Sequence, residues 1–143
     1  MLSWRVNNMS IKKLTVSDIR RVMGVSYKQN ITVQWHTERL TLRQFLPLKE
    51  YLETIDSVVN DCIDPSTGKP VYELLEFAMR ANIISSYAYV DMPTEVDEFY
   101  AAVYCSDLYD TVCKYVNSSQ VAAIKEAVNK RLTDGAGVHK WAS

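Results

Sequence analysis

Residues 31–46 read ITVQWH, TER and LTLRQFL, two runs of alternating apolar and polar side chains joined by a short polar link at 37–39. Alternation with a period of two is typical of strands with one apolar face. The apolar face carries Ile31, Val33 and Trp35 in the first run and Leu40, Leu42 and Phe45 in the second. The stretch therefore predicts a β-hairpin over residues 31–46.

After Pro47 the apolar residues recur at every third or fourth position, which is the spacing of amphipathic helices. Pro47 suits the first turn of a helix, and the apolar stripe that follows includes Ile55. Helices are predicted to run from Pro47 to Ile63, from Val71 to Val90, after a cap at Thr94, after Ser106, and from a cap at Asn117 to Asp134. Because two strands alone bury too little apolar surface, the hairpin must pack on these helices. The predicted fold is α+β and mostly α, with an N-terminal hairpin on a bundle of about four to five helices.

The chain divides into three parts. Residues 1–30 are expected to form an N-terminal arm with a short helix capped at Thr15. Residues 31–134 form a single globular domain, and residues 135–143 form a flexible tail. Met9 offers an alternative start within the arm.

Composition narrows the class of protein. The 143 residues carry 16 Lys and Arg against 17 Asp and Glu, so the formal charge of -1 gives no general attraction to nucleic acid or anionic lipid. No apolar run is long enough for a membrane span or a secretory signal, so we expect a soluble, cytoplasmic protein without a membrane partner. The cysteines Cys62, Cys105 and Cys113 match no metal or redox spacing, which predicts free thiols.

No group of residues specifies a reaction. The two histidines, His36 and His139, fall in a turn and in the tail, so they favour neither a metal site nor a catalytic triad. The sequence Ser66-Thr67-Gly68-Lys69 resembles part of a phosphate-binding loop but lacks its earlier glycine and is followed by proline. We therefore expect a non-enzymatic protein with no catalytic, cofactor or metal residues.

Aromatic and acidic side chains are instead the candidates for binding a protein partner. Carboxylates gather around the predicted junctions between residues 91 and 110, where they suit helix starts and could also form an acidic surface. Tyr51 is one further aromatic anchor of the same kind. The predicted partner-binding residues are Trp35, Phe45, Glu95, Asp97, Glu98, Phe99, Asp107 and Tyr109.

The order of these segments resembles a known group of proteins. A hairpin precedes the Pro47–Ile55 helix start, a Tyr/Ala-rich helix, the acidic link Asp91–Glu98 and the helix start Ser106–Val112. This layout is similar to that of small proteins of Gram-positive bacteriophages and prophages, in particular the tail assembly chaperones. The resemblance covers about residues 31–132 and implies a cytoplasmic assembly protein in the bacterial host, with virion association as a further option. It implies phage structural proteins as partners, a possible homo-oligomer and no cofactor.

Two other functions stay open. The protein could be a phage-encoded inhibitor whose acidic surface docks on a host defence or nucleic-acid enzyme. It could also be a small DNA-binding regulator, because residues 19–26 resemble a helix-turn-helix turn and Arg20, Arg21 and Lys28 are basic. Nucleic acid is the less expected partner, since too few residues separate Ser26 from the hairpin for a recognition helix.

Overall fold

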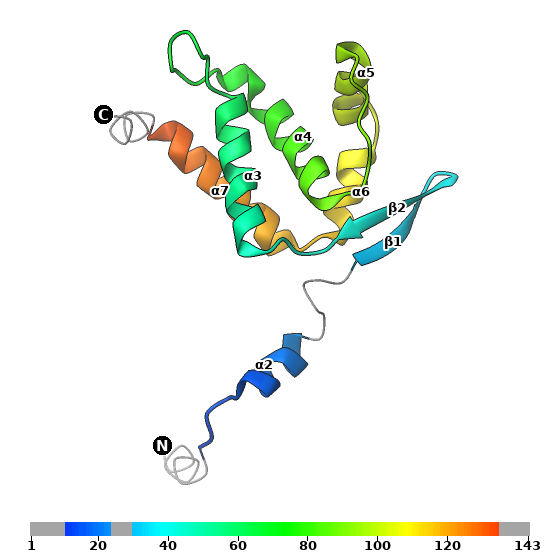
Figure 1. Cartoon of the computed structure of the whole chain (residues 1–143), viewed down its shortest axis with the longest axis vertical. Helices are drawn as coiled ribbons and strands as arrows, with labels where there is room; N and C mark the ends of the chain where they lie inside the picture. The colour runs from blue at the N-terminus through cyan, green and yellow to red at the C-terminus, as the bar shows by residue number, and fades with distance from the viewer. Residues whose placement is uncertain (1–10, 24–29, 135–143) are drawn as a thin grey trace.

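The computed structural model describes residues 11–23 and 30–134 (Figure 1). Over these residues an antiparallel hairpin and a larger set of helices form a mostly helical α+β fold, which confirms the predicted fold class. Predictions for the first ten residues, for the turn after Met23 and for the tail from residue 135 lie outside the described residues. The elements are α2 (Val16–Met23), β1 (Asn30–Trp35), β2 (Glu38–Arg43), α3 (Leu48–Asp61), the 3-10 turn η1 (Tyr72–Leu74), α4 (Leu75–Tyr87), α5 (Val96–Tyr100), the π-helical η2 (Ala101–Cys105), α6 (Leu108–Tyr115) and α7 (Ser118–Thr133).

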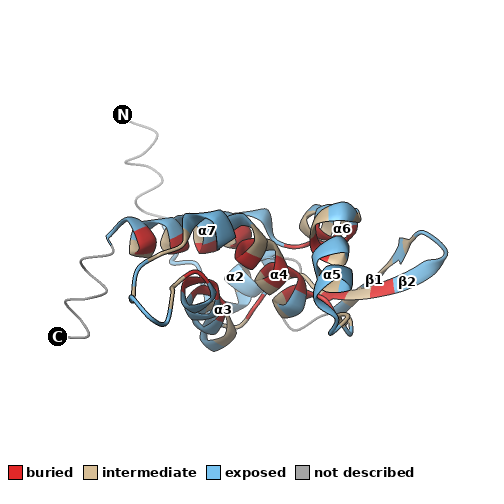
Figure 2. Ribbon diagram, turned by 90° about the horizontal axis from the view of Figure 1, so that it is seen from above, coloured by how far each residue is buried: buried red, intermediate tan, exposed pale blue. Residues whose placement is uncertain are grey.

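The hairpin turn is tighter than predicted. Trp35 pairs with Glu38, so the turn consists of His36 and Thr37 rather than residues 37–39. His36 has a φ of 55°, a left-handed conformation that matches the twist of a two-residue hairpin turn. Figure 2 shows that the turn projects beyond the helices and is exposed. The predicted apolar face is present: that of β1 is half-buried and that of β2 is buried.

The chain leaves the hairpin earlier than predicted. β2 ends at Arg43, and Leu46, not Phe45, is the residue that enters the core. Phe45 keeps 38% of its surface exposed. The reason is a tertiary contact, because both backbone polar groups of Leu46 are hydrogen-bonded to Gln120 of α7 and these bonds fix its orientation.

The core lies among α3, α4, α7 and the inner face of the hairpin. α3 packs against both α4 and α7, and the three helices lie side by side in Figure 1. Ile55 of α3, Ile84 of α4 and Ile124 of α7 are buried at this meeting point. The apolar stripes expected from the spacing thus face one another.

α4 is shorter than the predicted helix over residues 71–90. It begins after η1 and ends at Tyr87, where the chain becomes extended. Ala88 forms a β-bridge with Leu42, and the Tyr89 amide donates to the Thr41 carbonyl at 2.9 Å. This pairing adds a short third segment beside β2 and supports a hairpin that would be marginal alone.

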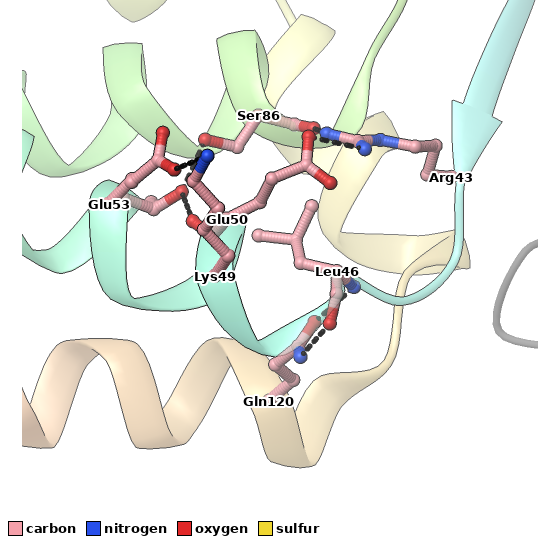
Figure 3. Close-up of polar contacts among 8 residues, drawn as sticks. Arg43, Leu46, Lys49, Glu50, Glu53, Ser86 and Gln120 are labelled. Carbon is pink, nitrogen blue, oxygen red and sulfur yellow. Dashed lines mark hydrogen bonds and ion pairs between the residues drawn. The ribbon is translucent and has the colours of Figure 1, made fainter.

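A polar network joins the hairpin to three helices (Figure 3). Arg43 donates to the Glu50 carboxylate at 2.7 Å and to the Ser86 carbonyl at 2.6 Å, so it links β2, α3 and α4. Gln120 accepts from the Leu46 amide at 2.8 Å and donates to the Leu46 carbonyl at 2.9 Å. The junction after β2 is therefore held by specific hydrogen bonds as well as by apolar packing.

Candidate functional site

The acidic link before α5 forms a helix cap, although not at the predicted residue. Glu95, rather than Thr94, is the N-cap, and its carboxylate accepts from the Glu98 amide at 2.7 Å. This cap fixes the start of α5 and leaves the side chains of Asp97 and Glu98 exposed. A carboxylate at this position also suits the positive end of the helix.

α5 continues directly into the π-helical η2. The Ser106 amide donates to the Ala101 carbonyl at 3.0 Å, which is the five-residue step of a π-helix. Tyr100 and Tyr104 lie together on this segment, with ring centroids 5.4 Å apart. Single π-helical turns occur frequently at functional sites, which makes this segment a candidate.

Four aromatic rings gather where α4 meets α5 and η2. Phe77 of α4 lies 5.5 Å from Phe99 in an edge-to-face arrangement, and it stacks on Tyr100 and Tyr104 at 6.0 Å each. These separations are those of favourable aromatic pairs. Arg80 covers the Tyr104 ring at 4.8 Å, and burial raises the pKa of the Tyr104 phenol.

These rings form one wall of a groove of about 790 Å³, which we call the aromatic groove. Much of its apolar lining is open to solvent, with Val96 78% exposed and Tyr100 52% exposed. An exposed concave surface rich in aromatic residues is typical of a binding site. The groove is lined by Glu73, Leu74, Phe77, Pro93, Thr94, Val96, Phe99, Tyr100 and Tyr104.

One carboxylate lines this groove, and three more belong to the adjoining start of α5. Glu73 lines it, and Glu95, Asp97 and Glu98 belong to the same cap and first turn as Val96; we call these four residues the acidic rim. Among residues 11–23 and 30–134, no lysine or arginine lines the groove. Arg80 lies nearby, but its guanidinium donates to Glu76 at 2.9 Å and lies over the Tyr104 and Tyr109 rings. The groove therefore has a mostly apolar lining with one carboxylate, and further carboxylates lie in the adjoining cap and first turn of α5.

Of the predicted partner-binding residues, Phe99 lines the aromatic groove, whereas Glu95, Asp97 and Glu98 belong to the adjoining cap and first turn of α5 without lining it. Asp107 does not join them. Its carboxylate accepts from the Trp35 indole at 2.8 Å and contacts His36 at 2.9 Å, which ties the hairpin tip to the start of α6. These hydrogen bonds, that of His36 first, lower the pKa of Asp107.

Tyr109 and Phe45 lie apart from this site. Tyr109 is only 6% exposed, between Arg80 and Lys125, so it belongs to the core and is not the exposed anchor that we predicted. Burial raises the pKa of its phenol. Phe45 lines a smaller groove of about 400 Å³ with Tyr51, between the start of α3 and α7.

Three of the four rings, those of Phe77, Tyr100 and Tyr104, were not among the predicted partner-binding residues. Phe77 falls outside the main apolar stripe of its helix, which was the available signal that α4 has a second apolar face. Tyr100 and Tyr104 are four residues apart, a spacing that places them together on a helix. Their meeting with Phe77 depends on a contact between distant segments that no local pattern contains.

Comparison of the chain with protein-family models, curated proteins and solved structures found no match. Within residues 11–23 and 30–134, no group of three or more His, Cys, Asp and Glu residues is arranged to hold a metal ion. None of the helices in those ranges has the length and apolar character required to cross a membrane.

Proposed function

We propose that this protein is a non-enzymatic interaction protein that binds a protein partner in the aromatic groove. The observation that carries the proposal is the groove lined by four clustered aromatic side chains, of which Tyr100 is exposed and the other three are half-buried. Aromatic residues dominate the binding energy of protein interfaces, whereas rim charges mainly select and steer the partner. The groove suits an amphipathic segment that carries apolar residues on one face and Lys or Arg beside them.

The hairpin offers a second contact of another kind. β1 pairs with β2 on one side, and no other strand of the described residues pairs with it. An open strand edge can accept an extended segment through backbone hydrogen bonds. Such an edge supports the proposal of a binding protein with two separate contacts for one partner or for two.

The biological setting that we propose is bacteriophage tail assembly in the host cytoplasm, with phage structural proteins as partners. The resemblance in segment order to tail assembly chaperones supports this part of the proposal, together with the hairpin and the groove. An assembly chaperone needs surfaces that hold apolar segments of another protein, and the aromatic groove is a surface of that type.

The acidic rim also favours a second candidate, an inhibitor of a host nucleic-acid or defence enzyme. Glu73 lines the groove and Asp97 and Glu98 lie in the adjoining first turn of α5, all three exposed, and a set of exposed carboxylates can occupy a channel that binds phosphates. In this alternative the charges would dominate binding and the rings would matter less.

Affinity capture tests both candidates. The tagged protein is recovered from phage-infected cells beside two variants, Tyr100→Ala in the groove and Tyr89→Ala as a matched control, since Tyr89 is similarly exposed and does not line the groove. Tail or head proteins should co-purify with the wild-type and Tyr89→Ala proteins and be depleted about 10-fold or more with Tyr100→Ala. Recovery of a host nuclease that is insensitive to Tyr100→Ala would favour the inhibitor and contradict the groove proposal.

A further inference from the structure

The N-terminal helix α2 has an apolar face that nothing covers in the described residues. It buries no residue, and Val16, Ile19, Val22 and Met23 are all exposed, Val22 by 80%. At 100° per residue these four fall on one side of the helix. The helix is well capped, because Thr15 and Asp18 exchange hydrogen bonds at 2.9 and 3.1 Å.

An eight-residue helix is marginal in water without tertiary contacts. A sequence that caps such a helix and gives it a continuous apolar face is typical of a segment that folds against another surface. The polar side of the segment is basic: residues 11–23 contain Lys12, Lys13, Arg20 and Arg21 against the single carboxylate of Asp18. The missing surface should therefore be apolar and acidic.

The aromatic groove has that character. Its floor consists of Phe77, Val96 and Tyr100, and the link from residue 91 to residue 98 contains four carboxylates and no lysine or arginine. We propose that α2 of one copy of this protein docks in the aromatic groove of a second copy. The inference rests on the proposed function of the groove and names one of its occupants.

The length of chain between α2 and β1 favours docking in a second copy over docking in the groove of the same chain. The groove lies at the start of α4, whereas the other end of α4, at Ala88, meets β2 beside the beginning of β1 (Figure 1). Thirteen helical residues at 1.5 Å each separate the two ends by about 20 Å. Seven Cα steps from Met23 to Asn30 span at most about 25 Å, which leaves almost nothing for turning α2 into its own groove.

Exchange between two copies has no such restriction. If α2 of each copy enters the groove of the other, the two contacts are equivalent and the assembly closes as a symmetric dimer. The apolar contacts hold the dimer, and the pairing of Lys and Arg with the acidic rim makes it sensitive to salt. The same exchange would compete with a partner for the groove.

Sedimentation velocity of the full chain over a range of concentrations tests the inference. We expect a dimer at low salt whose dissociation constant rises at least 10-fold in Ile19→Ser/Val22→Ser and in Tyr100→Ala. Ser17→Asn, on the opposite face of α2, and Tyr89→Ala, outside the groove, should match the wild type. All of these side chains are exposed, so the variants should fold.

Mixing the two defective chains identifies the contact. The α2 variant keeps an intact groove and Tyr100→Ala keeps an intact α2, so a mixture should form a heterodimer with one of the two contacts. A monomer at all concentrations, a dimer insensitive to both variants, or no heterodimer in the mixture would each overturn the inference. Co-sedimentation of the wild-type chain with anionic vesicles, lost in Ile19→Ser/Val22→Ser without any dimer, would assign α2 to a membrane surface and overturn it also.

The outcomes separate this inference from the proposed function. Ile19→Ser/Val22→Ser leaves the groove unchanged, so it should capture a groove partner from infected cells at least as well as the wild type. A monomeric protein that captures its partner through Tyr100 would refute the exchange of α2 and leave the proposed function standing.

Discussion

Replacing Gln120 with leucine tests how the hairpin is fixed to the helices. The Gln120 side chain makes three hydrogen bonds: it accepts from the Leu46 amide and from the Tyr87 hydroxyl, and it donates to the Leu46 carbonyl. Leu46 and Tyr87 are both fully buried. Leucine has a similar volume but no polar atom, so Gln120→Leu leaves three buried polar groups without this partner.

The expected loss of stability in Gln120→Leu follows from the cost of leaving buried polar groups without a hydrogen bond. Each buried polar group that loses its hydrogen bond costs about 1–3 kcal/mol. Rotation of the phenol and small backbone shifts relieve part of the total, so we expect Gln120→Leu to lower the free energy of unfolding by about 3–5 kcal/mol. Tyr87→Phe removes one hydroxyl and leaves both bonds of Leu46 intact, and it should cost about 1 kcal/mol.

Equilibrium urea unfolding, followed by far-ultraviolet circular dichroism, measures these changes. With a slope of about 2 kcal/mol per molar urea, the Gln120→Leu midpoint should fall by about 1.5–2.5 M. Gln34→Leu is the control, because Gln34 is exposed on the hairpin and bonds only to the nearby His36 carbonyl among the described contacts. A loss below about 0.5 kcal/mol for Gln120→Leu, equal to that of the control, would refute this account of the junction.

Three further predictions concern the cap, the hairpin tip and the core. Glu95→Ala should lower stability by about 1 kcal/mol through loss of the α5 cap while Thr94→Ala changes little, and equal effects in thermal unfolding would contradict the assignment of the cap. The pKa of Asp107 is depressed in the folded state, so its pairing stabilises the fold above the ordinary carboxylate pKa and is lost as the pH falls through the folded value. An NMR titration should therefore show the Asp107 pKa rising toward its ordinary value in His36→Ala, and an unchanged value would exclude the contact. Ile124→Ala should cost about 2–5 kcal/mol in urea unfolding because it opens a cavity in a fully buried position, and a cost below 1 kcal/mol would place Ile124 outside the core.

Most of the secondary structure could be predicted from residue periodicity. Alternation revealed the hairpin, and three-to-four spacing revealed the helices, because each element buries one face in a common core. Local chemistry also predicted two caps, Thr15 at α2 and Asn117 at α7, where the Asn117 carboxamide accepts from the Gln120 amide at 2.8 Å.

The errors arose where tertiary contacts decide the backbone. α4 ends early because Ala88 and Tyr89 pair with β2, a contact between segments more than 40 residues apart in the chain. Leu46 displaces Phe45 from the core because Gln120, at the start of a distant helix, binds its backbone. The π-helical turn at η2 has no sequence signal as strong as the periodicity that predicted the strands and helices.

The candidate site was predictable only where its residues are neighbours in sequence. Glu95, Asp97 and Glu98 belong to one short acidic run, and Phe99 follows it directly. Asp107 lies in the same acidic region of the sequence, yet its carboxylate accepts a hydrogen bond from Trp35 of the hairpin and does not join the groove. The aromatic groove itself depends on α4 packing beside α5 and η2, which no local pattern states.

Hydrogen–deuterium exchange of the protein with and without a partner recovered by affinity capture tests the central claim most directly. We predict that the partner slows exchange in residues 93–104 and at the start of α4, where the aromatic groove lies, and that Tyr100→Ala removes this protection. Protection confined to the hairpin, to α7 or to the smaller groove beside Phe45, with residues 93–104 unchanged, would contradict the claim that the aromatic groove is the binding site.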